Sequence, residues 1–231
     1  VLDKDEVKSV YPSFYFYLFG IGETEIEGKN ECKYYLEAYR ESKVADSDNP
    51  YLQQYYSSGC ANSTNLYSMY YELQRQETLI ASYVGETDIY VLDGVGAEYT
   101  PLIIELLVIN GYEVEYCDYA SCHLPSITDV NKEYMASIGY KEWFLDFDQK
   151  VIHGEFYKSA INLRKAFDIL EEKIRDILIR IHPLILGRLQ KPEVQAIVFC
   201  QLHDFSIALG LGAVHAVPAS QGSQGIELFS C

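Results

Sequence analysis

The chain has 231 residues, of which 48% are hydrophobic, enough for the core of one large domain or two small ones. Its 18 basic and 34 acidic residues give a formal net charge of −16, which excludes a basic surface for direct nucleic-acid binding. No apolar run approaches the roughly 18 residues that a membrane-spanning helix needs. The charged start lacks the features of a signal peptide, so we expect a cytoplasmic protein whose first residue, Val1, is an arbitrary boundary within a longer chain.

Six cysteines are present, and no two of them form a Cys-x-x-Cys pair. Because no secretion signal is visible, we expect free thiols rather than a disulfide framework or a zinc knuckle. The cysteines are Cys32, Cys60, Cys117, Cys122, Cys200 and Cys231.

Residues 1–86 are expected to form a helical region ahead of the main domain. A dense aromatic run over residues 11–19 fits either a strand or a packed helical layer. A helix is expected over residues 27–42, followed by a polar turn and linker over residues 45–58. Apolar residues at helical spacing predict a stronger helix over residues 62–83, which packs against the sheet that follows.

From residue 87 onward the pattern predicts an α/β domain with a mainly parallel sheet flanked by helices. Residues 89–92 are an apolar strand that stops at Asp93, and Gly94 and its successors lead into a helix over residues 98–109. Residues 113–117 alternate in character like a second strand. A carboxylate that follows a buried strand lies where open α/β sheets present groups to ligands, so Asp93 is a candidate site residue.

A second candidate loop follows this β-α-β unit. It reads Leu124-Pro125-Ser126-Ile127-Thr128 and offers two hydroxyl groups. Asn131 stands three residues after Thr128, at the start of another helical pattern. A strand-end carboxylate and a loop hydroxyl together predict a phosphoryl-transfer site.

The string IYVLDGVGAEYTPLIIELLVINGYEVEYC, continued by HLPSITDVNK, resembles the opening of a PglZ domain. PglZ domains are a branch of the alkaline phosphatase superfamily, found in BREX-type phage-defence systems and in some bacterial response regulators. The resemblance covers about a third of the chain well and another third loosely. It implies an alkaline phosphatase-like core over residues 87–231, incomplete and atypical after about residue 183.

The resemblance also assigns roles to single residues. In the superfamily an Asp after the first core strand binds a divalent metal, and a Thr or Ser on a following loop accepts the phosphoryl group. Asp93 matches the metal ligand, and Thr128 matches the nucleophile, with Ser126 as its rival. Asn131 resembles the oxyanion-binding Asn of related phosphodiesterases. The intact family site holds two divalent ions, which we expect to be zinc.

Further metal ligands are expected from two later segments. PglZ-like proteins carry an Asp and a His four residues apart, whereas the corresponding Asp148 and His153 are five apart. The superfamily also uses an Asp-His-Gly signature after a later strand, and that tripeptide is absent from this sequence. After a strand expected over residues 196–200, His203 resembles its His, but Leu202 stands at the carboxylate position. Because this ligand set is incomplete, we expect the chain to bind divalent metal weakly or not at all.

The rest of the C-terminal half shows one clear element. A helix is expected over residues 159–181, closed by Pro183. Residues 210–231 are rich in Gly, Ala, Ser and Gln and fit a loop-rich end, a disordered tail or a segment that is not native to the domain. His215 within them is a further possible ligand.

Three functions of different classes remain open. The first is a metal-dependent phosphatase or phosphodiesterase of a bacterial phage-defence system, which hydrolyses a phosphate-ester substrate through Thr128 and works with other defence-system proteins. The second is a catalytically inactive scaffold of the same fold within a defence complex. The third is an unrelated α/β binding domain, such as a receiver-like or nucleotide-binding module, but the sequence contains no glycine-rich nucleotide-binding motif.

Overall fold

The computed structural model describes residues 3–20, 30–56, 70–81, 87–110, 112–123, 128–140, 142–153, 163–187, 195–201, 215–218 and 226–230. The predictions for Ser126 and His203 fall outside these residues. The backbone of Thr128 is described, whereas its side chain is not.

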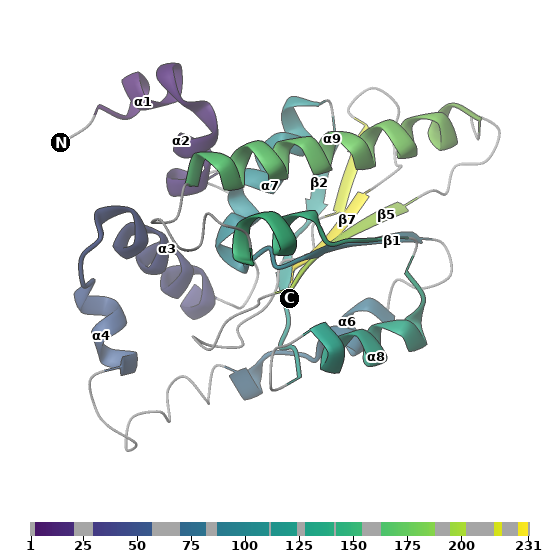
Figure 1. Ribbon diagram of the computed structural model, residues 1–231, viewed down its shortest axis with the longest axis horizontal. Helices are drawn as coiled ribbons and strands as arrows, with labels where there is room; N and C mark the ends of the chain where they lie inside the picture. The colour runs from purple at the N-terminus through teal and green to yellow at the C-terminus, as the bar shows by residue number, and fades with distance from the viewer. Residues whose placement is uncertain are drawn as a thin grey trace.

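The centre of the described chain is a seven-stranded mixed sheet (Figure 1). Its strands in sheet order are β2 (Tyr112–Tyr116), β6 (His215–Pro218), β7 (Ile226–Ser230), β5 (Gln195–Gln201), β1 (Thr87–Asp93) and β4 (Glu142–Phe144), with β3 (Asp118–Tyr119) paired to β7. β1 is parallel to both of its neighbours, and β5 is parallel to β7. β6 is antiparallel to β2 and β7. The predicted parallel sheet is therefore confirmed at its centre, and the strands expected at 89–92, 113–117 and 196–200 are β1, β2 and β5.

Helices cover the sheet on two sides. The described helices of the whole chain are α1 (Lys4–Val10), α2 (Pro12–Phe19), α3 (Asn30–Ala45), α4 (Pro50–Tyr56), α6 (Gln76–Ala81), α7 (Thr100–Ile109), α8 (Thr128–Ile138) and α9 (Leu163–Gly187), with a 3₁₀ turn η2 (Ala97–Tyr99) and a π-helical turn η3 (Asp148–Ile152). Figure 1 shows α7 and α9 on one side of the sheet and α6 and α8 on the other. None of these helices combines the length and the hydropathy that a membrane crossing requires.

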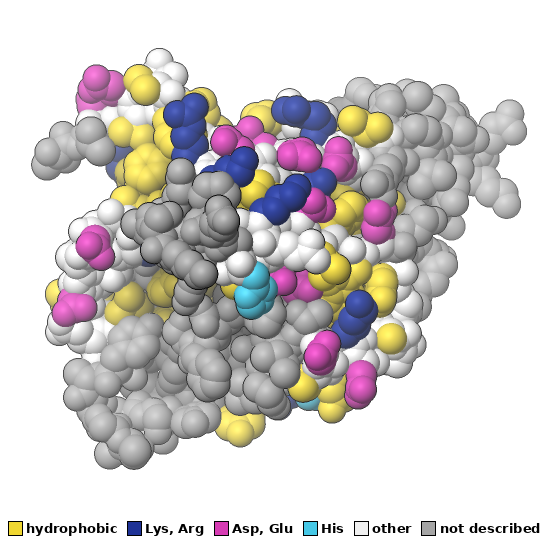
Figure 2. All heavy atoms as spheres, viewed as in Figure 1, with side chains coloured by type: hydrophobic (Ala, Val, Ile, Leu, Met, Phe, Trp, Pro, Cys, Tyr) yellow, Lys and Arg dark blue, Asp and Glu magenta, His cyan; other side chains and the backbone are white. Residues whose placement is uncertain are grey.

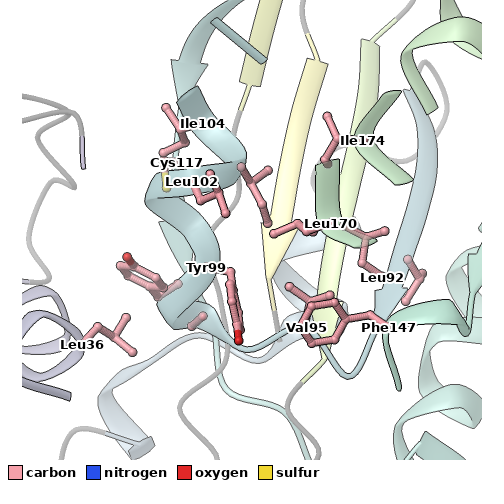
Figure 3. Packing of buried hydrophobic residues seen from close by; sticks show 14 of the residues in the cluster. Leu36, Leu92, Val95, Tyr99, Leu102, Ile104, Cys117, Phe147, Leu170 and Ile174 are labelled. Carbon is pink, nitrogen blue, oxygen red and sulfur yellow. The ribbon is translucent and has the colours of Figure 1, made fainter. Parts of the chain in front are cut away.

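The core forms around β1. Residues 89–92 are between 1% and 3% exposed, because helices cover both faces of this strand. Aromatic rings fill the space beyond its end, where the ring centroids of Tyr99 and Phe147 are 5.3 Å apart (Figure 3). Fully burying a side chain of this size stabilises a fold by roughly 1.5–3 kcal/mol. Cys117 and Cys122 are buried in this core, and burial raises the pKa of the Cys122 thiol to about 12.

The N-terminal helices are anchored to the sheet domain. Tyr17 of α2 is fully buried, with its ring centroid 5.3 Å from that of Tyr99. Lys43 of α3 forms an ion pair with Glu98 of η2, with Nζ and Oε1 3.1 Å apart. Burial alone would lower the pKa of Lys43, but the Glu98 carboxylate and nearby tyrosine hydroxyls outweigh it and raise that pKa above its ordinary value. The helical region therefore shares one continuous core with the α/β domain.

The predicted helix over residues 62–83 is interrupted within its described part. Residues 73–75 leave the helix, and α6 begins at Gln76. The Ser121 N–H donates to the Gln74 oxygen at 2.8 Å, and the Ser121 oxygen accepts from the Gln76 N–H at 3.1 Å. Hydrogen bonds to a segment distant in sequence thus replace those of a helix, so the prediction of one continuous helix is wrong.

The linker predicted over residues 45–58 contains α4. Proline suits the first position of a helix, and Pro50 occupies it. Asn49 Oδ1 caps the same helix by accepting from the Tyr51 N–H at 2.9 Å. Asn49 and Pro50, which the sequence pattern placed in a turn and linker, therefore form the start of a helix.

One prediction about the C-terminal half is also wrong. Pro183 does not close the long helix, since α9 continues to Gly187. A proline removes one backbone hydrogen bond and can kink a helix without ending it. Residues 210–231 are not wholly irregular, because β6 and β7 lie within them and join the sheet.

Charged side chains gather along α9. In Figure 2, Lys and Arg side chains are interspersed with acidic ones over the region that this helix occupies in the same view. Lys173 Nζ lies 3.0 Å from Asp176 Oδ2 and 3.4 Å from Asp146 Oδ2. This face of α9 is therefore ion-paired, and Lys173 itself is buried among its carboxylate partners.

Candidate functional site

Asp93 ends β1 as a fully buried carboxylate. A buried charge needs polar partners, and one of them is Trp143, whose Nε1–H donates to Asp93 Oδ2 at 2.9 Å. Trp143 comes from β4, where it stands opposite Val91. Because side chains alternate along a strand, Val91 and Asp93 share a face of the sheet, which places the indole beside the carboxylate.

Gly94 brings the end of β1 into contact with η3. Its φ is +77°, a left-handed conformation that glycine adopts most readily. A Cβ atom at this position would lie 2.8 Å from the Cα of Asp148 and 3.0 Å from its Cβ. The backbone after Asp93 therefore lies directly against Asp148, which joins two of the predicted metal-ligand segments.

The five-residue spacing of Asp148 and His153 is accommodated by a π-helical turn. The His153 N–H donates to the Asp148 backbone oxygen at 2.8 Å, so residue i+5 returns to residue i as residue i+4 does in an α-helix. The side chains meet as well, with His153 Nε2 3.5 Å from Asp148 Oδ1. Asp148 is buried and His153 is exposed. The one additional residue between Asp148 and His153, compared with the expected spacing, therefore does not separate the two side chains.

Asn131, the predicted oxyanion donor, is fully buried and fixes the backbone of His123. Its Oδ1 accepts from the His123 N–H at 2.8 Å and from Gln76 Nε2 at 2.9 Å. Its Nδ2 donates to the His123 oxygen at 3.2 Å. These bonds tie the first turn of α8 to the chain that leads into the second loop. A role toward a substrate oxygen stays a prediction.

His123 itself is a polar residue that the sequence analysis missed. Its Nε2 lies 2.9 Å from Glu77 Oε1, and its ring stacks on Tyr134 with centroids 3.6 Å apart. Glu77 and His123 are 46 residues apart in the chain. No local pattern could have paired them, because the contact depends on how α6 lies against the segment that follows β3.

Lys132 and Trp143 were also missed, and they connect α8 with Asp93. Lys132 Nζ lies 5.2 Å from the centroid of the Trp143 ring, a cation–π distance. Trp143 is in turn hydrogen-bonded to Asp93. The spacing of four between Thr128 and Lys132 was the signal available, since such residues share one face of a helix.

The structure thus brings together only part of the predicted site. Asp93, Asp148 and His153 lie on contacting segments, and α8 begins at Thr128. Among the described residues, no three His, Cys, Asp or Glu side chains form a group that could hold a metal ion. His215 lies in β6, and its side chain is not among those described.

Comparisons of this chain with protein-family models, with curated proteins and with solved structures found no match.

Proposed function

We propose that this chain is a PglZ-like domain of the alkaline phosphatase superfamily that hydrolyses a phosphate ester with the help of a divalent cation. The contact between Gly94 and Asp148 is the observation that supports this proposal most directly. It joins the segments of Asp93, Asp148 and His153 at the carboxyl end of a central parallel strand, where α/β sheets bind ligands. As the resemblance implies, the protein would act with other phage-defence proteins.

The donor types of this edge suit a divalent cation. Carboxylate oxygens and imidazole nitrogen are both ligands of zinc, and Asp93, Asp148 and His153 offer them, although no three such side chains among the described residues form a group that could hold the ion. A bound cation would neutralise charge on the phosphoryl oxygens during transfer. Tight zinc sites use three or four converging ligands, and the described residues offer no such group, so we propose that the ion is bound weakly.

The position of α8 supports Thr128 as the nucleophile. α8 leads into β4, which is parallel to β1, so the helix starts toward the edge at which β1 ends. Lys132, four residues after Thr128, contacts the indole that binds Asp93. A phosphoryl group at the first turn of α8 would also be favoured by the positive end of the helix dipole.

In the proposed reaction, the Thr128 oxygen forms a bond to phosphorus while the bond from phosphorus to the ester oxygen breaks. The Thr128 hydroxyl gives up its proton in this step, and the alkoxide leaving group takes up a proton and departs as the alcohol. Water then cleaves the phosphothreonine, which releases the phosphate and gives back the hydroxyl. Trp143 orients the Asp93 carboxylate through Oδ2. The buried Asn131 keeps the chain before the loop in place, so that the hydroxyl is presented in one geometry.

Hydrolysis of p-nitrophenyl phosphate and bis(p-nitrophenyl) phosphate, with Zn²⁺ or Mn²⁺ added, tests this proposal and separates monoester from diester chemistry. Thr128→Ala and Asp93→Asn should abolish hydrolysis, whereas Ser126→Ala should retain it. Acid quenching followed by mass spectrometry should find phosphate on Thr128. Loss of a single hydroxyl at the start of a helix changes stability by only about 1 kcal/mol, so the melting temperature of Thr128→Ala serves as the folding control.

Two outcomes would contradict the assignment. An active Thr128→Ala with an inactive Ser126→Ala would move the nucleophile to Ser126. A folded wild-type chain that hydrolyses neither ester with either metal would reject the hydrolase and leave the inactive scaffold.

A further inference from the structure

We propose that Lys132 is an anion-binding residue, whose ammonium group holds a tetrahedral oxyanion beside the first turn of α8. This assignment of the substrate rests on the proposed function, under which the oxyanion is the phosphoryl group of the ester. Binding of inorganic phosphate tests Lys132 without any turnover.

The position of Lys132 is defined by two successive contacts. Its Nζ lies 5.2 Å from the centre of the Trp143 ring, and the N–H of that indole is 2.9 Å from Asp93 Oδ2. Tyr140 packs against the same indole, with ring centroids 5.3 Å apart. The half-buried Lys132 side chain is therefore directed to the predicted site by an aromatic ring, which attracts the ammonium without neutralising its charge.

Several other lysines of the protein are neutralised by carboxylates. Lys43 is paired with Glu98, and Lys150 with Asp146, at nitrogen-to-oxygen distances of 3.1 and 2.8 Å. Within the described part of the chain, Lys132 has no carboxylate within 4.0 Å and so forms no ion pair. In a chain with 34 acidic and 18 basic residues, an uncompensated ammonium at this edge is a suitable partner for an anion.

The helix adds a second favourable contribution. Thr128 and Lys132 are four residues apart, so they share one face of α8, and Thr128 is the first residue of the helix. The N-terminal turn of a helix carries partial positive charge and backbone N–H groups that favour anions. An oxyanion held by Lys132 on this face is therefore next to the proposed nucleophile.

Trp143 makes the test direct, because it is the single tryptophan of the chain. Its fluorescence reports on the indole that contacts both Lys132 and Asp93. The wild-type chain would be titrated with inorganic phosphate, first in the presence of a chelator and then with Mg²⁺. Lys132→Met removes the charge while keeping most of the length of the side chain, and Lys132→Arg keeps the charge. Lys165→Met, on the exposed side of α9, is the matched control.

We expect a saturable change of Trp143 fluorescence in the wild type, in Lys132→Arg and in Lys165→Met. Lys132→Met should bind phosphate about tenfold more weakly or worse, as expected for loss of a charge-assisted contact. Equal affinity in Lys132→Met, or no saturable change in the wild type, would overturn the inference. If Lys132→Met is unfolded by circular dichroism, Lys132→Gln replaces it, with the same expected loss.

The failure of this inference can be distinguished from the failure of the proposed function. Phosphate binding that depends on Lys132 in a chain without hydrolase activity supports the inference and not the function. Hydrolysis with an unchanged KM in Lys132→Met supports the function and rejects the inference.

Discussion

Gly94→Ala tests the contact that joins the end of β1 to Asp148. The added methyl would enter a backbone with φ of +77°, which costs an L-residue about 1–2 kcal/mol. It would also lie 2.8 Å from the Cα of Asp148, and overpacking against backbone costs about 1–3 kcal/mol more. We therefore expect the free energy of unfolding to fall by about 2–5 kcal/mol, a large share of the 5–15 kcal/mol typical of a domain.

Gly139→Ala is the matched control. Its φ is +87°, but an added Cβ would have no atom within 4 Å. The free energy of unfolding of Gly139→Ala should fall only by the cost of the left-handed backbone conformation, about 1–2 kcal/mol. Both substitutions restrict the unfolded chain in the same way, so their difference isolates the steric conflict with Asp148.

Urea denaturation followed by circular dichroism gives both free energies by linear extrapolation. Gly94→Ala should be less stable than Gly139→Ala by about 1–3 kcal/mol. Equal destabilisation of the two variants would refute the close approach of Gly94 to Asp148, and with it the shared edge on which the proposed cation site depends.

Two further substitutions test how the surroundings of the site are held. Asn131→Ala removes three hydrogen bonds to Gln76 and His123 and should lower the free energy of unfolding by about 2–4 kcal/mol. As a control on the same helix, Ser137→Ala changes an exposed residue and should alter that free energy by less than about 0.5 kcal/mol. Thermal melts of the two variants decide this, and a neutral Asn131→Ala would contradict the role given to the amide. Lys43→Met leaves the Glu98 carboxylate buried without its ion pair and should lower the free energy of unfolding by about 3–5 kcal/mol. Adding Glu98→Gln removes the unpaired charge and should restore most of that loss. A double variant as unstable in urea as Lys43→Met would mean that lost packing, rather than charge, is responsible.

Sequence patterns correctly predicted the helices and strands that form because of properties of their own residues. The apolar run over residues 89–92 and the helical spacing over residues 98–109 are correct, because burial and periodicity are properties of each segment. The helix over residues 62–83 fails at residues 73–75, because Ser121 competes for their hydrogen bonds. Pro50 was misinterpreted because proline marks both breaks and helix starts.

In the candidate site too, features set by one segment were predicted, whereas contacts between distant segments were not. The sequence pattern placed Asp93 directly after a strand, and in the structure it is the last residue of that strand. Its neighbour Trp143 comes from a parallel pairing of β1 with β4 that no sequence spacing reveals. The five-residue interval between Asp148 and His153 weakened their assignment, yet the π-helical turn brings the two side chains together.

Isothermal titration of the wild-type chain with Zn²⁺ tests the central claim, that the segments of Asp93 and Asp148 form one cation-binding edge. Stoichiometric binding should appear with a dissociation constant above about 1 μM, which corresponds to a binding free energy weaker than about −8 kcal/mol. Asp93→Asn should abolish this binding and His153→Ala should weaken it, while His123→Ala, whose ring pairs with Glu77, should leave it unchanged. Absence of binding in the wild type, or the same binding in Asp93→Asn, would contradict the claim.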